Sequence, residues 1–182
     1  MSFLEALRQM KAQTFAAATV LALAASTPAL AEESTNRVAA ETAWSVFVED
    51  DPRECWAVSA PRETVNTRGG QPANVRRGDI LLFTTYRGGE EAGEVSFTGG
   101  YPFDPERPVG LTVGSNEFQL FVDGQWAWAG SPEDDAQIMA AMRAGAEAVL
   151  TARSSRGTDT RDTFSLFGYT AATEEAQRRC AD

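Results

Sequence analysis

The sequence predicts a mainly β protein: an antiparallel β-sandwich with one short internal helix and a C-terminal helix. Short runs of aromatic and β-branched residues recur between turn signals along most of the chain, which is typical of the strands of a sandwich. After residue 41, helix signals occur at two places only, around residues 131–145 and 170–179. We find no internal repeat and no second domain.

Residues 1–31 have the pattern of an export signal. Arg8 and Lys11 supply a basic region, and an uncharged apolar run follows over residues 15–25. Ala29-Leu30-Ala31 is the small-x-small pattern that signal peptidase recognises, so we place the cleavage after Ala31. The alternative is a membrane anchor, but a bilayer span needs about 20 apolar residues and this run is shorter.

The rest of the chain has the length of one domain. Residues 32–41 are polar without a period, which predicts a flexible lead-in. Residues 42–182 are predicted to form a single β-sandwich domain, with no segment after the signal that could cross a membrane as a helix.

The expected strands alternate in character and are bounded by turn residues. The first two, 44–48 and 55–58, flank an acidic turn, and a long loop over 61–78 follows them. Asp123-Gly124 is a strong two-residue turn signal later in the chain. Further strands are expected at residues 79–86, 93–98, 109–113, 117–122, 125–128, 148–152 and 163–167.

Both predicted helices have recognisable signals. The internal helix has Ser131 as its N-cap, Asp134 in the position of an acidic capping box and Gly145 as its stop. The final helix, over about 170–179, repeats apolar residues at spacings of three and four. This spacing places Cys180 on the stripe that faces the core.

The composition excludes several classes of chemistry. The chain has no His, and its only Lys is Lys11, so every base after the signal is an Arg that stays protonated. Ser-His-Asp and Cys-His catalysis, Schiff bases and imidazole metal sites are therefore excluded, whereas carboxylate enzymes such as glycosidases remain. The net charge of −10 argues against nucleic acid and anionic lipid as partners.

The chain has two cysteines, Cys55 and Cys180. In an oxidising compartment an even number predicts a disulfide, here closing a loop of about 125 residues. The alternative is two unpaired buried thiols. A redox-active pair does not fit, because the spacing is unlike Cys-x-x-Cys.

Carboxylate clusters are the remaining catalytic material. The clusters 49–51 and 133–135 could bind a hard cation through oxygen, but neither has the spacing of a calcium loop. The second cluster is explained by the helix N-terminus, where acids favour the dipole. We therefore assign no catalytic, metal-binding or cofactor-binding residue.

Two features remain as candidates for partner contact. Trp126 and Trp128 are two residues apart and point to one face of their strand, either outward to a sugar or a protein or into the core. The small or polar residues on the other face favour the core. The loop arginines Arg68, Arg76 and Arg77 could recognise an anionic glycan, phosphate or acidic partner, or form a solvated loop without a ligand.

The chain from about residue 42 to 180 resembles the invasion-associated locus B family, exported proteins of Gram-negative bacteria. The resemblance rests on Trp44, on CWAVSAP at 55–61, on DAQIMAAMRAG at 135–145 and on FSLFGYTAA at 164–172. It implies an immunoglobulin-like β-sandwich in the cell envelope, with a role in binding or envelope maintenance. The chain departs from many relatives in having two cysteines and an acidic, lysine-free domain, which argues against a role in host invasion.

These observations predict a non-enzymatic envelope protein that binds a protein or an envelope polymer such as a glycan. We expect it in the periplasm, with the outer surface or the medium as alternatives. A carboxylate-dependent glycan hydrolase is the second hypothesis, and a structural or chaperone-like envelope protein is the third.

Overall fold

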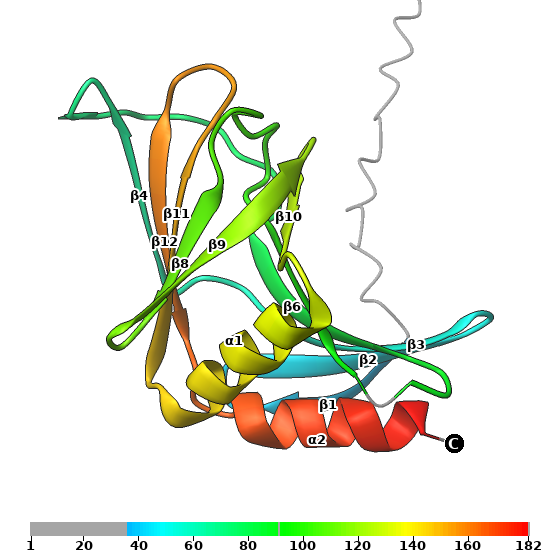
Figure 1. The fold of residues 1–182 in the computed structure, drawn as a ribbon. Helices are drawn as coiled ribbons and strands as arrows, with labels where there is room; N and C mark the ends of the chain where they lie inside the picture. Colours follow the sequence, from blue (N-terminus) through cyan, green and yellow to red (C-terminus); the bar gives the residue numbers. More distant parts are fainter. Residues whose placement is uncertain (1–35, 91, 182) are drawn as a thin grey trace, which may run out of the picture. The chain divides into compact units, whose positions relative to one another are not determined.

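The computed structural model describes residues 36–90 and 92–181, which lie within one compact unit, Ser34–Asp182 (Figure 1). The predicted export signal, its cleavage after Ala31 and the start of the lead-in lie outside the described residues. Among the residues described, no helix is long and apolar enough to cross a bilayer.

The described chain is mainly β with two helices, as the sequence predicts. Its elements are, in chain order, β1 (Arg37–Glu41), β2 (Trp44–Asp50), β3 (Arg53–Ser59), β4 (Glu63–Arg68), β5 (Gln71–Pro72), β6 (Leu81–Arg87), β7 (Glu94–Thr98), β8 (Val109–Val113), β9 (Asn116–Asp123), β10 (Trp126–Trp128), α1 (Pro132–Ala144), β11 (Glu147–Arg153), β12 (Asp159–Ser165) and α2 (Tyr169–Cys180).

Within the described residues the strands form one twelve-stranded sheet in the order β1-β2-β3-β6-β7-β10-β9-β8-β11-β12-β4-β5. Every neighbouring pair is antiparallel, and β1 and β5 are the two edges, so the sheet is open. Strand β9 connects the two halves of the sheet, because residues 116–120 pair with β8 and residues 121–123 pair with β10.

The two halves of the sheet share one hydrophobic core. Phe97 on β7 and Phe164 on β12 are far apart in the strand order, yet their ring centroids lie 6.1 Å apart in an edge-to-face arrangement. Phe103, from the connection between β7 and β8, packs against Phe97 with centroids 5.8 Å apart. The edge-to-face contact of Phe97 with Phe164 adds to the stabilisation that burial itself provides.

Helix α2 covers β1, β2, β3 and β6 on the core side, and α1 packs on β7 (Figure 1). Trp44 and Tyr169 meet edge to face with centroids 4.9 Å apart, and the Trp44 indole N–H donates to the Ser165 carbonyl over 2.9 Å. The indole N–H of the fully buried Trp44 thus has a partner, as a buried polar group requires.

Two stretches predicted as irregular are strands. Residues 37–41, expected as part of a flexible lead-in, form β1 and pair with β2. Residues 63–68, expected within a long loop, form β4 and pair with β12 over five positions. Both expectations were wrong. The side chains of these strands are mostly exposed, so the sequence has no apolar pattern there, and the strands are stabilised by backbone hydrogen bonds to a partner strand.

The signals read for the internal helix are confirmed. Ser131 is the N-cap of α1 and its hydroxyl accepts a hydrogen bond from the backbone N–H of Asp134 over 3.2 Å. Gly145 is the C-cap, where a Cβ would lie 2.5 Å from Val113 Cγ1. Glycine therefore ends α1 at a point of close packing against β8.

Candidate binding surfaces

The face of the sheet that is turned away from α2 carries a row of large apolar side chains. Cys55 on β3 is bonded to α2, so its neighbour Trp56 points to the opposite face. The strand registers place a further set of side chains on this same face. We call this surface the aromatic face: Phe47, Trp56, Val58, Leu81, Phe83, Phe121, Trp126 and Trp128.

The aromatic face is continuous because β7, in its middle, presents small side chains. Ser96 and Thr98 are buried on this face, between Phe83 on β6 and the tryptophans of β10. The rings of Phe83 and Trp126 therefore meet across β7, with centroids 5.6 Å apart. Trp126 in turn stacks on Trp128, with centroids 6.2 Å apart and an interplanar angle of 24°.

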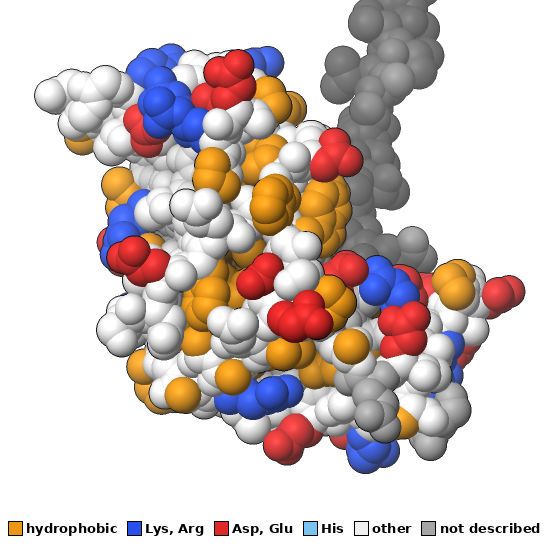
Figure 2. All heavy atoms as spheres, viewed as in Figure 1, with side chains coloured by type: hydrophobic (Ala, Val, Ile, Leu, Met, Phe, Trp, Pro, Cys, Tyr) orange, Lys and Arg blue, Asp and Glu red, His pale blue; other side chains and the backbone are white. Residues whose placement is uncertain are grey.

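Trp126 and Trp128 do lie on one face of their strand, but that face is the outer one. Ala127, between them, is fully buried in the core, and Trp126 is 38% exposed. The interpretation that favoured a core pair was wrong, because Ala127 is the residue of β10 that points into the core and its two neighbours point away from it. Figure 2 shows hydrophobic side chains reaching the surface over β9 and β10.

The two ends of the aromatic face differ in shape. Phe121, 67% exposed, lies over the backbone of Gly130, where a Cβ would be 2.5 Å from its ring. At the other end, a hollow of about 360 Å³ is lined by Asn36 and by apolar side chains. Those are Phe47, Trp56, Val58, Leu81 and Phe83.

The three arginines proposed for partner contact have different environments. Arg77 is buried: its guanidinium donates to both carboxylate oxygens of Asp162 over 2.7 and 2.6 Å, and lies 4.9 Å from the centroid of the Tyr101 ring. These contacts within the fold occupy the Arg77 guanidinium. Arg68 and Arg76 are exposed, and with Arg77 they line one cavity of about 410 Å³.

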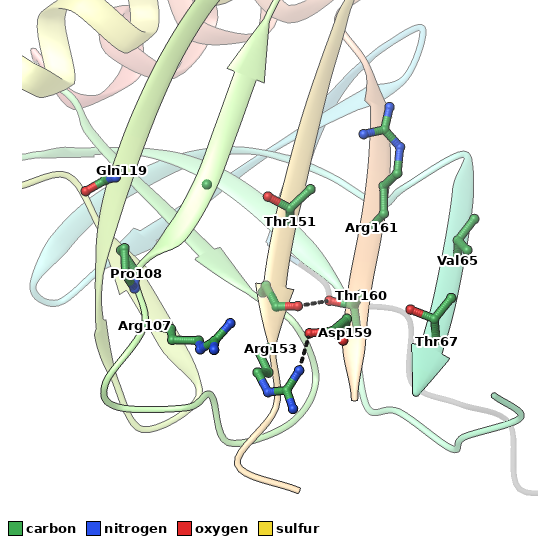
Figure 3. A pocket seen from close by; sticks show the side chains of 12 residues that line it. Val65, Thr67, Arg107, Pro108, Gln119, Thr151, Arg153, Asp159, Thr160 and Arg161 are labelled. Carbon is green, nitrogen blue, oxygen red and sulfur yellow. Dashed lines mark hydrogen bonds and ion pairs between the residues drawn. The ribbon is translucent and has the colours of Figure 1, made fainter. Parts of the chain in front are cut away.

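A second hollow, of about 550 Å³, lies on the outer face of β8, β9, β11, β12 and β4 (Figure 3). Gly110 stands between Gln119 and Thr151 in this part of the sheet, and a Cβ there would lie 2.7 Å from Thr151 Oγ1. The hollow contains one carboxylate, Asp159, which accepts a hydrogen bond from Arg153 over 2.7 Å. A single acid paired with an arginine does not form the two-carboxylate arrangement of a glycosidase.

The acidic clusters have structural partners. In the first, Asp50 pairs with Arg53 at the turn between β2 and β3. In the second, Asp135 is buried and accepts a hydrogen bond from the Val95 backbone N–H over 2.7 Å. Among the described residues, no group of three or more acids, cysteines or histidines is arranged to hold a metal.

Burial raises the pKa of Asp135 to about 6, against the opposing effect of the hydrogen bond from Val95. The nearby carboxylates of Glu94 and Asp134 raise the pKa further. Asp135 lines none of the hollows described above. Its position indicates that it attaches the first turn of α1 to β7.

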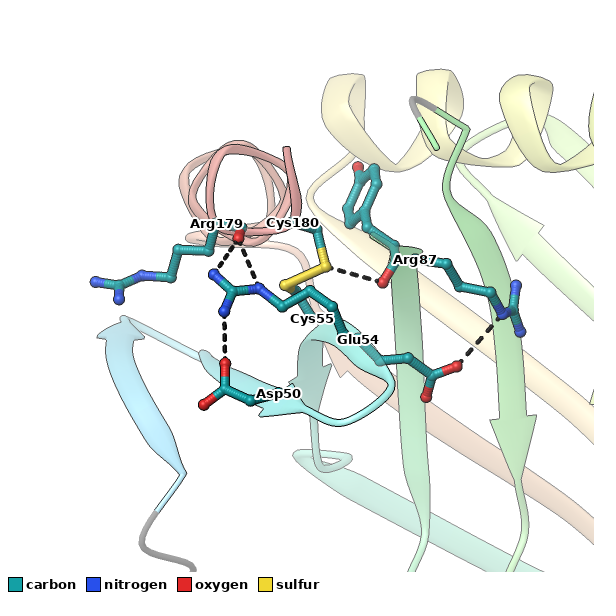
Figure 4. Close-up of a disulfide and its surroundings, with 8 residues drawn as sticks. Asp50, Glu54, Cys55, Arg87, Arg179 and Cys180 are labelled. Carbon is teal, nitrogen blue, oxygen red and sulfur yellow. Dashed lines mark hydrogen bonds and ion pairs between the residues drawn. A yellow bond between two sulfur atoms is a disulfide. The ribbon is translucent and has the colours of Figure 1, made fainter. Parts of the chain in front are cut away.

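Cys55 and Cys180 lie at disulfide distance, with their Cα atoms 5.8 Å apart and 125 residues apart in the chain (Figure 4). The pair joins the core side of β3 to the last residue of α2. Arg53 supports the same junction, because its guanidinium donates to the Arg179 carbonyl over 2.7 and 3.2 Å. A cation at this position satisfies a carbonyl at the helix C-terminus and favours the helix dipole.

Comparison with known proteins gives a likeness in fold. No protein-family model and no curated protein matches the chain. The crystal structure of invasion-associated protein B from Bartonella henselae is similar over 76% of this chain and 94% of that one, with a TM-score of 0.52 and 17% sequence identity. At this identity the similarity shows a shared fold alone: the chain has a fold like that of invasion-associated protein B.

Proposed function

We propose that this chain is an exported, non-enzymatic protein of the cell envelope, of the invasion-associated locus B type, that binds a partner through the aromatic face. The single observation that carries the proposal is a row of aromatic side chains on an outer sheet face. Phe83 meets Trp126, Trp126 stacks on Trp128, and the strand register sets Phe121 opposite Trp128. Contiguous exposed apolar surface rimmed by polar residues marks interaction sites in proteins of this size.

The chemistry of the aromatic face favours a partner protein over an envelope polymer. Sugar binding combines ring stacking with polar groups that hold the hydroxyls, whereas the hollow on this face has Asn36 and five apolar side chains. Aromatic side chains that are held rigidly contribute most to protein–protein affinity, because little conformational entropy is lost on binding. Trp126 is held by Phe83 and Trp128 in this way.

We also propose a periplasmic location and an immunoglobulin-like sandwich for this chain. The export pattern of residues 1–31 supports a periplasmic location, with the outer surface or the medium as alternatives. The contact between Phe97 and Phe164, across the two halves of the sheet, supports an immunoglobulin-like sandwich arrangement. The fold shared with invasion-associated protein B supports the family.

The test is chemical crosslinking in living cells of the native producer, followed by affinity purification and mass spectrometry. We expect one dominant partner whose capture saturates and is lost in the double variant Phe121→Ser/Trp126→Ser. Phe167→Ser is the matched control, since Phe167 is also well exposed, at 64%, but follows β12 outside the aromatic face. Equal capture by both variants would contradict the proposal, and capture of no specific partner would favour a structural or chaperone-like role.

A further inference from the structure

None of the residues that line the cavity of about 410 Å³ belongs to the aromatic face. We call this cavity the arginine pocket. It forms where the β4–β5 hairpin, the coil before β6, the segment after β7 and the β11–β12 turn come together. Its basic and polar lining residues include Arg68, Arg76, Arg77, Arg156, Gln125 and Ser155.

The arginine pocket is assembled from segments far apart in the chain. Arg68 ends β4, Arg76 follows β5, and Arg156 comes from the turn between β11 and β12. Figure 2 shows basic side chains gathered at the end of the sheet where that turn lies. No Asp or Glu is among the residues that line the pocket.

Three of these arginines have no carboxylate partner within the described part of the chain. Arg77 is neutralised by Asp162, but Arg68 donates to the neutral hydroxyl of Thr158 over 2.8 Å. Arg76 and Arg156 form no ion pair with any described residue. Three uncompensated positive charges therefore converge on one cavity in a chain whose net charge is −10.

The wall of the pocket also has apolar surface, which Tyr101, Pro102 and Val75 supply beside the exposed Arg68, Arg76 and Arg156. Gln125 and Ser155 add neutral hydrogen-bonding groups. The volume is in the lower part of the range for sites that bind small organic molecules.

We propose that the arginine pocket binds a phosphorylated sugar, with Arg68, Arg76 and Arg156 holding the phosphate. A phosphate monoester carries close to two negative charges at neutral pH and three terminal oxygens. The planar guanidinium groups can each donate two hydrogen bonds to these oxygens. The apolar wall and the amide of Gln125 then accommodate the sugar ring and its hydroxyls.

The test is isothermal titration calorimetry on the purified, disulfide-bonded protein with glucose 6-phosphate, inorganic phosphate and glucose as probes. We expect glucose 6-phosphate to bind most tightly, inorganic phosphate more weakly and glucose not at all. Affinity should fall as the salt concentration rises, because the contacts are ionic. Equal affinity for inorganic phosphate and glucose 6-phosphate would overturn the assignment of a sugar ligand.

Substitutions locate the site. Each of Arg68→Gln, Arg76→Gln and Arg156→Gln should weaken glucose 6-phosphate binding by at least about tenfold, since each removes a charge-assisted contact. Arg178→Gln is the matched control, because it removes the same charge from the exposed end of α2 and should leave affinity unchanged. Thermal unfolding of all four variants checks that the fold is kept, and unchanged affinity in the three pocket variants would overturn the proposal.

Discussion

Arg77 and Asp162 form a buried, two-pronged ion pair that joins the coil before β6 to β12. The Arg77 side chain is 6% exposed and that of Asp162 is fully buried. The same guanidinium also donates to the Gly99 carbonyl over 2.8 Å and to the Asn66 side chain over 3.2 Å. Burial raises the pKa of Asp162, and the hydrogen bonds and charge of Arg77 oppose that effect.

Removing one member of this pair should destabilise the fold strongly. Arg77→Met or Asp162→Leu leaves the other charge buried without its partner, which costs about 3–5 kcal/mol. The double variant Arg77→Met/Asp162→Leu should lose less than either single variant, because it leaves no unpaired charge. Urea unfolding of the three variants measures this, and a double variant that loses the sum of both single effects would contradict the account.

The link between Cys55 and Cys180 should account for a large share of the stability. A disulfide that closes a loop of about 125 residues lowers the conformational entropy of the unfolded chain, which stabilises the folded state by at most roughly 4–5 kcal/mol. We expect the free energy of unfolding of the variant Cys55→Ala/Cys180→Ala to be about 2–5 kcal/mol lower than that of wild type. Urea unfolding of this variant, beside the oxidised and reduced wild type, measures the loss. Two free thiols per chain in protein purified from the native producer would contradict the pairing.

Gly168 should not tolerate a side chain. Its φ is +93°, and a Cβ would overlap the backbone carbonyl group of Glu41 on β1. Gly168→Ala should therefore destabilise the protein by more than about 2 kcal/mol, since backbone must move in addition to the cost of a positive φ.

Gly69→Ala separates these two contributions to the cost. Gly69 has a φ of +56° with no atom within 4 Å of the added Cβ, so only the cost of about 1–2 kcal/mol for the left-handed conformation applies. Thermal unfolding of both variants measures how much stability each one loses. Equal losses of stability would contradict the close approach of Gly168 to β1.

Asp135 should make stability depend on pH between about 4 and 6. Its pKa rises from 3.8 to about 6 on folding, so the folded state binds the proton more tightly than the unfolded state. The resulting stabilisation is fully present below pH 3.8 and is lost as the pH rises through 6. By linkage it amounts to at most about 3 kcal/mol.

Asp135→Asn isolates this effect. The variant keeps an oxygen that accepts the hydrogen bond from Val95 but cannot ionise, so stability near pH 7 should rise relative to wild type. The difference between variant and wild type should shrink as the pH falls toward 4. Urea unfolding at several pH values tests this, and a difference that does not change between pH 4 and 7 would contradict the assignment.

Much of the fold follows from local sequence signals. The strand at 109–113 has the predicted bounds, and α1 begins after its predicted N-cap, because side-chain alternation and capping residues act over short distances. Strand β4 escaped prediction because its residues, ETVNTR, lack an apolar face and depend on β12, about 100 residues later.

The candidate binding surfaces depend on strand pairings that the sequence alone does not reveal. The pattern Trp-Ala-Trp at 126–128 fits either face of the sheet, and the register with β7 and β9 decides between them. Arg77 and Asp162 are 85 residues apart, so the loop arginine gave no sign of being buried. Arg156 was not singled out, because a lone arginine in a turn-rich segment does not by itself indicate a pocket.

The central claim is that the aromatic face contacts a partner, and site-specific photo-crosslinking in living cells tests it most directly. Benzoylphenylalanine would replace Phe121 in one sample and Phe167 in the other, since both are well-exposed phenylalanines. The account predicts one dominant adduct from position 121 that excess unlabelled wild type suppresses and that position 167 does not form. The same adduct from both positions, or none from position 121, would contradict it.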